Sequence, residues 1–238
     1  MKRVFFFACL FFFTAVLWAC GSSFDDRSKI KLRNHVFDIP KENLYSSSLV
    51  RFFEGFGTDK GAFETLLFFT GVELANQIPG FSPQIFGGGI YYKEYVPADV
   101  VVVLSATREK NIKRAETGMN YEEMWRGIGS YLPDQLGPRV VEYDSNVGLY
   151  RVYRKQISRS WVFTNINPEE VGDKLPHDNA VIAHCTQPER EERPYSCLLS
   201  YRKGGLNISY SLREENIIHY KEVTAFIYDR LSEWEVKD

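Results

Sequence analysis

Apolar and polar residues alternate along much of the second half of the chain, which is the pattern of half-buried β-strands. From residue 139 onward the strand-like segments are RVVEY, VGLYRVYRK, RSWVFTNI, NAVIAHC, SCLLSYR and LNISYSL. Lys203-Gly204-Gly205 separates the last two and predicts a tight hairpin. Short connections of this kind join antiparallel neighbours, so the sequence predicts an antiparallel sheet here.

The first half holds fewer such segments. Residues 30–40, IKLRNHVFDIP, alternate well enough to predict one strand that ends at Pro40. Residues 62–70 predict a second strand, and residues 98–106 contain four consecutive valines, typical of a strand buried on both faces. Residues 76–89 are rich in proline and glycine and predict a long loop, either a binding loop or a plain connector.

Two segments have helical spacing. Residues 120–132 begin at Asn120, a suitable N-cap with Glu123 in the capping-box position, and end before Pro133. Residues 215–234 carry an apolar stripe of Val223, Phe226, Ile227, Leu231 and Trp234. The predicted fold class is α+β: a mainly antiparallel sheet with a middle helix and a C-terminal amphipathic helix packed on it.

The N-terminus has the pattern of a cleaved export signal. Lys2 and Arg3 precede 16 uncharged residues, fewer than the roughly 20 that span a bilayer. An uncleaved signal-anchor extending to Phe24 is the alternative. We therefore expect a signal peptide at 1–19, a polar tether at 20–29 and an α+β domain at 30–238, with two lobes meeting near 140–158 as a further possibility.

Leu17-Trp18-Ala19-Cys20 resembles the bacterial lipobox, although Trp18 is bulkier than usual at its position. The resemblance implies cleavage before Cys20 and acylation of its thiol, which anchors the chain to a membrane. Gly21 follows the cysteine, which by the same resemblance favours the outer membrane, facing the periplasm, over the inner one.

Cysteine usage agrees with export. Cys9 would leave with the signal and Cys20 would carry lipid, so Cys185 and Cys197 remain as an even pair. In an oxidising compartment this pair is expected to form a disulfide, which stabilises by roughly 3 kcal/mol. Two free buried thiols are the alternative. No four-ligand spacing predicts a metal site.

The sequence offers no recognisable catalytic chemistry. It has no Gly-x-Ser-x-Gly elbow, no HExxH helix and no CxxC pair, and its formal net charge of −2 gives no basic field for nucleic acid. We expect a non-enzyme without cofactor or metal, the alternative being an enzyme of unrecognised type with His177 or His184 in a cleft. The charged run 189–193 between the cysteines is either a solvated loop or a contact surface.

The layout resembles a known class of proteins. A lipobox, the early VFDIPKENL segment (36–44) and the late run from Cys197 through the hairpin and the final helix are similar to periplasmic immunity lipoproteins of type VI secretion effectors, phospholipases in particular. The resemblance implies a protein partner: a toxin that is bound in the periplasm and blocked. A structural or accessory outer-membrane lipoprotein is the alternative class.

Overall fold

The computed structural model describes residues 26–45, 64–86, 95–106, 136–172, 180–188 and 194–237. The strands are β1 (Arg27–Leu32), β2 (His35–Pro40), β3 (Glu64–Phe69), β4 (Gln84–Phe86), β5 (Tyr95–Pro97), β6 (Val100–Ala106), β7 (Arg139–Asp144), β8 (Leu149–Arg154), β9 (Ser160–Thr164), β10 (Val181–Thr186), β11 (Ser196–Lys203) and β12 (Leu206–Arg213). The helices are α3 (Gly71–Gln77), α6 (Pro168–Val171) and α7 (Tyr220–Trp234), with 3-10 turns η1 (Lys41–Asn43), η3 (Lys155–Ile157) and η5 (Glu214–His219).

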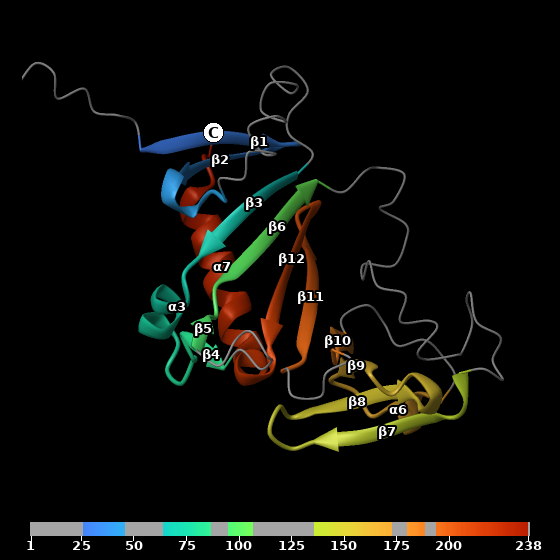
Figure 1. Cartoon of the computed structure of the whole chain (residues 1–238). Helices are drawn as coiled ribbons and strands as arrows, with labels where there is room; N and C mark the ends of the chain where they lie inside the picture. Colours follow the sequence, from blue (N-terminus) through green and yellow to red (C-terminus); the bar gives the residue numbers. More distant parts are fainter. Residues whose placement is uncertain are drawn as a thin grey trace, which may run out of the picture.

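One antiparallel sheet of eight strands organises the fold, in the order β3-β6-β12-β11-β10-β9-β8-β7. Strands β7 to β12 run as a meander from one edge toward the centre, and β6 and β3 complete the other edge (Figure 1). Two small sheets, β1-β2 and β4-β5, stand beside it. The predicted α+β class is confirmed, because α7 packs on a mainly antiparallel sheet.

The predicted hairpin between β11 and β12 is confirmed. Lys203 pairs with Leu206, so the turn consists of Gly204 and Gly205. Both glycines have positive φ, 60° and 83°, as this two-residue turn requires.

The prediction of one strand over residues 30–40 is wrong, because this segment forms the end of β1 and all of β2. The chain reverses between Leu32 and His35, which pair directly. Arg33 supplies the reversal with a φ of 56°, unusual for a residue other than glycine. No glycine or proline marks the turn, so the apolar alternation on either side reads as one strand.

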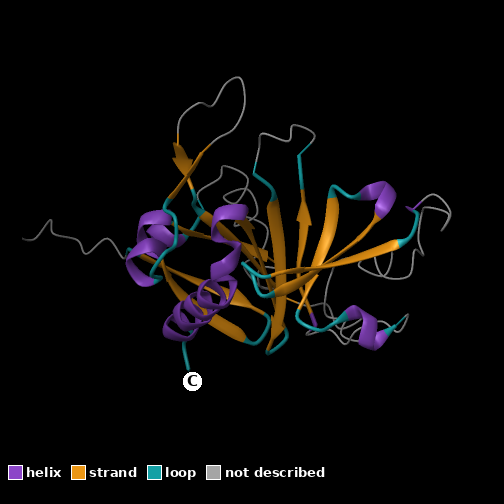
Figure 2. Cartoon of the chain, turned by 90° about the horizontal axis from the view of Figure 1, so that it is seen from below, coloured by secondary structure: helices purple, strands orange, loops and turns teal. Residues whose placement is uncertain are grey.

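The core lies between α7 and one face of the sheet (Figure 2). All five residues of the predicted helical stripe are buried. Phe69 of β3 sits between two of them, edge-on to Phe226 at 5.1 Å and stacked on Trp234 at 5.9 Å between ring centroids. Fully burying a side chain of this size stabilises the fold by about 1.5–3 kcal/mol.

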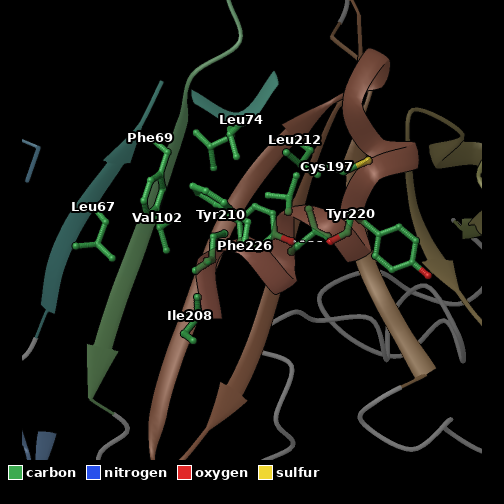
Figure 3. Packing of buried hydrophobic residues seen from close by; sticks show 14 of the residues in the cluster. Leu67, Phe69, Leu74, Val102, Cys197, Ile208, Tyr210, Leu212, Tyr220 and Phe226 are labelled. Atoms are coloured by element: carbon green, nitrogen blue, oxygen red, sulfur yellow. Dashed lines mark hydrogen bonds between the residues drawn. The ribbon is translucent and has the colours of Figure 1, made fainter. Parts of the chain in front are cut away.

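Tyr210 of β12 brings a polar group into this core. Figure 3 shows it among apolar side chains, with a hydrogen bond to the backbone of Tyr220. Its hydroxyl donates to the Tyr220 carbonyl at 3.2 Å and lies 2.6 Å from the Thr224 hydroxyl. Burial therefore raises its pKa well above the ordinary value while the hydrogen bonds satisfy the oxygen. These bonds tie the first turn of α7 to the sheet.

The prediction that the valine run of β6 is buried on both faces is also wrong. Val100 and Val102 are 2% and 0% exposed, but Val101 and Val103 are only partly buried. The strand therefore buries one face fully and the other in part, as in a sheet with a helix on one side.

Residues 76–89 are not loop throughout. The end of α3 occupies Asn76 and Gln77, and β4 pairs with β5 at Gln84 to Phe86. Thr70 is the N-cap of helix α3, and its hydroxyl accepts a hydrogen bond from the Glu73 amide at 3.1 Å. Seven residues are too few for a periodic signal, so the helix could not be predicted from the sequence pattern.

The predicted tether, the possible seam between lobes and the predicted middle helix can each be compared with the structure. Strand β1 begins at Arg27, inside the segment expected to be a tether (20–29). Residues 140–158, considered as a seam, fall in β7, β8 and η3, and β7 and β8 belong to the continuous sheet. The predicted middle helix (120–132) lies outside the described residues.

Candidate functional site

The disulfide between Cys185 and Cys197 is confirmed. The two residues face each other directly on β10 and β11, and both are 0% exposed. The bridge lies on the core face of the sheet (Figure 3), and it closes the base of the connection from β10 to β11. The alternative of two free thiols is therefore excluded.

Three other predicted features, Cys20, His177 and the charged run 189–193, lie outside the described residues.

The described histidines do not converge on one site. His35 belongs to β2, His184 to β10 and His219 to η5. His219 lies near Phe81, with ring centroids 6.3 Å apart. Each ring thus serves a different part of the fold.

His184 has one neighbour of chemical interest. Its Nε2 lies 2.7 Å from the hydroxyl of Ser160 on the adjacent strand β9, and burial lowers its pKa. A neutral imidazole at that distance is the geometry of a base beside a nucleophile. Within the described ranges, however, no carboxylate binds the other ring nitrogen, and no group of three potential metal ligands occurs there.

A pocket of about 370 Å³ opens near the N-terminal hairpin. Arg230 on its wall pairs with Glu73 at 3.3 Å and with Glu233 at 3.0 Å, so these charges satisfy one another. The lining residues are Arg27, Pro40, Glu42, Asn43, Glu73, Arg230, Glu233 and Trp234. They form a polar surface without a nucleophile, and they give this pocket no defined chemistry.

The most distinctive side-chain cluster is at the other end of the sheet. The guanidinium carbon of Arg151 lies 3.9 Å from the centre of the Trp161 ring and 5.3 Å from that of Tyr153. Tyr195 meets the same tryptophan edge-on, with centroids 4.9 Å apart. We call these four residues the Arg151 surface.

Strand register explains why they meet. Tyr153 of β8 faces Trp161 of β9, and Arg151 is two residues before Tyr153, so the three share one face. Strands β7 and β8 form the edge of the sheet away from the β1-β2 hairpin (Figure 1). Tyr195 arrives from the chain just before β11, close to the disulfide.

Arg151 is positioned by stacking and not by an ion pair. It makes no hydrogen bond or salt bridge to any other residue in the part of the chain that the structure describes. Trp161 below it is 1% exposed, whereas Arg151, Tyr153 and Tyr195 are partly exposed. The Nε of Arg151 is buried without a partner among the described residues, so the terminal nitrogens of the guanidinium are the donors left for an external acceptor.

Carboxylates surround the Arg151 surface. Glu142 is directly opposite Arg151 on β7, but it accepts a hydrogen bond from the Tyr153 hydroxyl at 2.8 Å, which raises the pKa of that tyrosine. Burial raises the pKa of Glu214, and burial together with the Glu214 charge raises that of Tyr195. Aromatic side chains with a mixed-charge rim are typical of protein interfaces.

The opposite face of the same edge carries a second aromatic pair. The rings of Tyr143 and Tyr150 lie 5.0 Å apart, and Tyr143 is 60% exposed. Sequence reasoning assigned these residues to strands but missed both clusters. The alternation in LYRVYR places Arg151 and Tyr153 on one face, yet nothing in it indicates that Trp161 and Tyr195 complete the group.

Comparisons with known proteins give little further identification. No protein-family model matches the chain, and no curated protein matches its sequence. One solved structure is similar: an immunity protein of the Stenotrophomonas maltophilia type IV secretion system, with 11% identity, 90% of this chain and 94% of that chain covered, and a TM-score of 0.48. At that identity and score, neither a shared fold nor a shared function follows. Among the helices of the described ranges, none is long and apolar enough to cross a membrane.

Proposed function

We propose that this protein is a lipid-anchored periplasmic binding protein that neutralises a toxin directed at the bacterial envelope. The observation that carries a binding role is the Arg151 surface, where an arginine that is stacked on Trp161 and has no ion pair among the described residues lies beside partly exposed tyrosines. Tyrosine, tryptophan and arginine are the residues that dominate the energy of protein interfaces. The toxin as partner rests on the resemblance to immunity lipoproteins in sequence layout.

Two further features support the cellular location in this proposal. The lipobox-like segment ending at Cys20 supports lipidation and anchoring at the outer membrane. The disulfide between Cys185 and Cys197 agrees with an oxidising compartment such as the periplasm. On this proposal the inhibitor is tethered at the membrane and presents the sheet edge to the incoming toxin.

The function is tested by deleting the gene and exposing the strain to siblings that retain their toxin-secretion systems. We expect loss of viability, rescued by the wild-type protein and poorly by Arg151→Ala. The toxin responsible is then identified by removing the sibling's effector genes in turn, and its complex with the purified inhibitor is measured.

If the deletion strain withstands every sibling effector, and the purified protein binds none of them, the immunity function is wrong. An envelope defect in a strain that meets no toxin would instead indicate an accessory outer-membrane lipoprotein.

The anchor has a separate test. Cys20→Ala should release the protein from the membrane fraction, because the acylated thiol is then missing. Cys9→Ala is the matched control, since that cysteine would leave with the signal, and it should leave the membrane association unchanged. Integral membrane association of the Cys20→Ala variant would indicate an uncleaved signal-anchor.

A further inference from the structure

His35 joins three segments that are far apart in the sequence. Its Nδ1 lies 2.5 Å from a carboxylate oxygen of Glu235, just beyond α7. Its Nε2 lies 2.8 Å from the carbonyl oxygen of Gly204, in the turn between β11 and β12. The ring itself belongs to β2 and stacks over Phe37, with centroids 6.0 Å apart.

The chemistry of the two partners determines the protonation state of the ring. A carbonyl oxygen and an ionised carboxylate both accept hydrogen bonds and donate none. A neutral imidazole carries one N–H, so one of its two nitrogens would present a lone pair to an acceptor. The imidazolium, with an N–H on each nitrogen, satisfies both contacts at once.

We propose that His35 is a protonation-dependent latch that fastens the β1-β2 hairpin to the C-terminal segment and to the β11-β12 turn. The protonated ring closes the latch, and loss of its proton opens it. This device is independent of whether the protein binds a toxin.

The charges around the ring favour the closed form. Its pKa is raised above 6.5, first by the hydrogen bond to Glu235, then by the Gly204 carbonyl and the Glu235 charge, and these outweigh the opposing effect of burial. The positive groups nearest to these contacts on the adjoining elements are Lys31 and Arg33 beside β2, Arg202 and Lys203 before the β11-β12 turn, and Lys237 after Glu235. The Lys203 ammonium lies over the Tyr228 ring, 4.5 Å from its centre, and Arg33 lies beside Gly205.

The latch is adjacent to a strand-like contact that holds the same segments together. The Val236 amide donates to the Val36 carbonyl at 2.8 Å, and Phe37 forms an isolated bridge with Glu235. When His35 loses its proton, the Glu235 contact loses its charge assistance and the hairpin is held less firmly. The Val236 amide therefore reports directly on opening.

The direction of the pH dependence follows from linkage. A histidine whose folded pKa is raised contributes its full stabilisation below 6.5, the unfolded value, and loses it as the pH rises through the folded pKa. Because one proton is involved, the opening equilibrium increases by at most about tenfold per pH unit across that window.

The test uses the full chain solubilised in detergent. Carbon-13-labelled histidine reports the pKa of His35, and hydrogen exchange reports the protection of the Val236 amide after correction for the intrinsic pH dependence of exchange. We expect His35 to titrate above 6.5 and Val236 protection to fall through the same pH range. Titration at or below 6.5, or protection that does not change with pH, overturns the latch.

Two variants separate the latch from ordinary packing. Glu235→Gln keeps the shape and removes the charge, so the His35 pKa should fall. His35→Gln should make Val236 protection insensitive to pH. His219→Gln is the matched control, because His219 lies beside Phe81, away from the hairpin, and it should retain the wild-type profile. If His35→Gln keeps the wild-type pH dependence, the proposal is wrong.

Discussion

Arg151 and Trp161 lie face to face, with the guanidinium carbon 3.9 Å from the ring centre and the ring itself 1% exposed. Trp161 is the buried apolar anchor of the pair. The Arg151 guanidinium covers its ring, and the terminal nitrogens of the guanidinium remain available as donors. Desolvated anchors of this kind, surrounded by partly exposed polar residues, are where binding energy concentrates in protein interfaces.

Replacing Arg151 should therefore weaken partner binding more than it weakens the fold. Arg151→Ala is expected to cost about 2 kcal/mol of binding, a roughly 30-fold loss of affinity, and about 1 kcal/mol of stability from the lost stacking. Arg151→Lys should recover little, because an ammonium cannot stack or donate as a planar fork. Calorimetric titration with the toxin proposed as partner measures the loss of affinity, and urea unfolding measures the loss of stability.

The exposed Arg27 of β1, which pairs with Asp38 in a separate small sheet, provides a matched control for this pair of measurements. Arg27→Ala removes the same charge far from the Arg151 surface, and we expect little change in affinity. Equal losses from both variants would mean that net charge, and not the Arg151 surface, governs binding.

Much of the fold could be predicted because it depends on local pattern. The alternation from residue 139 onward, the Gly204-Gly205 turn and the apolar stripe of α7 each contain their own signal within a few residues. The β1-β2 hairpin was missed because Arg33 takes the positive φ at the first turn position, where glycine or asparagine is usual, and Asn34 alone is a weak turn signal. Helix α3 was not predicted, because seven residues with one capping residue are too short to show helical periodicity.

Of the candidate site, only the disulfide could be predicted, because it depends on the number of cysteines and not on which strands are neighbours. Pairing Cys185 with Cys197 followed from the predictions that Cys9 leaves with the signal and Cys20 carries lipid, which left one pair of cysteines. The Arg151 surface depends on which strands are neighbours and in which register, and the contact of His35 with Glu235 joins residues 200 positions apart. A single sequence contains no record of such long-range pairing.

Reducing the disulfide should destabilise the protein without changing its fold class. Loss of the Cys185–Cys197 cross-link is expected to lower the free energy of unfolding by roughly 3 kcal/mol, because the unfolded chain regains loop entropy. Urea unfolding with and without reductant measures the difference. The Cys185→Ala/Cys197→Ala double variant is the control, and reductant should leave its unfolding midpoint unchanged.

Asn216 should be among the most sensitive polar positions. It is 2% exposed, it accepts from the Ser82 amide at 2.7 Å, and it donates to the Ser82 carbonyl at 3.0 Å. Asn216→Ala would remove the partners of the amide and carbonyl of the part-buried Ser82, and we expect a loss of about 1–3 kcal/mol in urea unfolding. Asn146→Ala, in the exposed turn after β7, should change stability by less than about 0.5 kcal/mol. Equal effects at the two positions would contradict the role of the Ser82 contacts.

His184 should give the opposite pH dependence to His35. Burial lowers its pKa below 6.5, so the unfolded chain binds its proton more readily, and the folded state loses stability as the pH falls from 6.5 through the folded pKa. The slope should stay well below the single-proton limit of about 1.4 kcal/mol per pH unit, because the ring is partly exposed.

Urea unfolding between about pH 5 and pH 8 measures this effect, and His184→Gln should remove the loss on the acid side. Ser160→Ala separates the two candidate causes of the lowered pKa. Because burial and not the hydroxyl at 2.7 Å lowers it, His184 should still titrate below 6.5 in that variant. A return to 6.5 or above in Ser160→Ala would assign the shift to the serine contact and would strengthen a nucleophile-and-base interpretation of the pair.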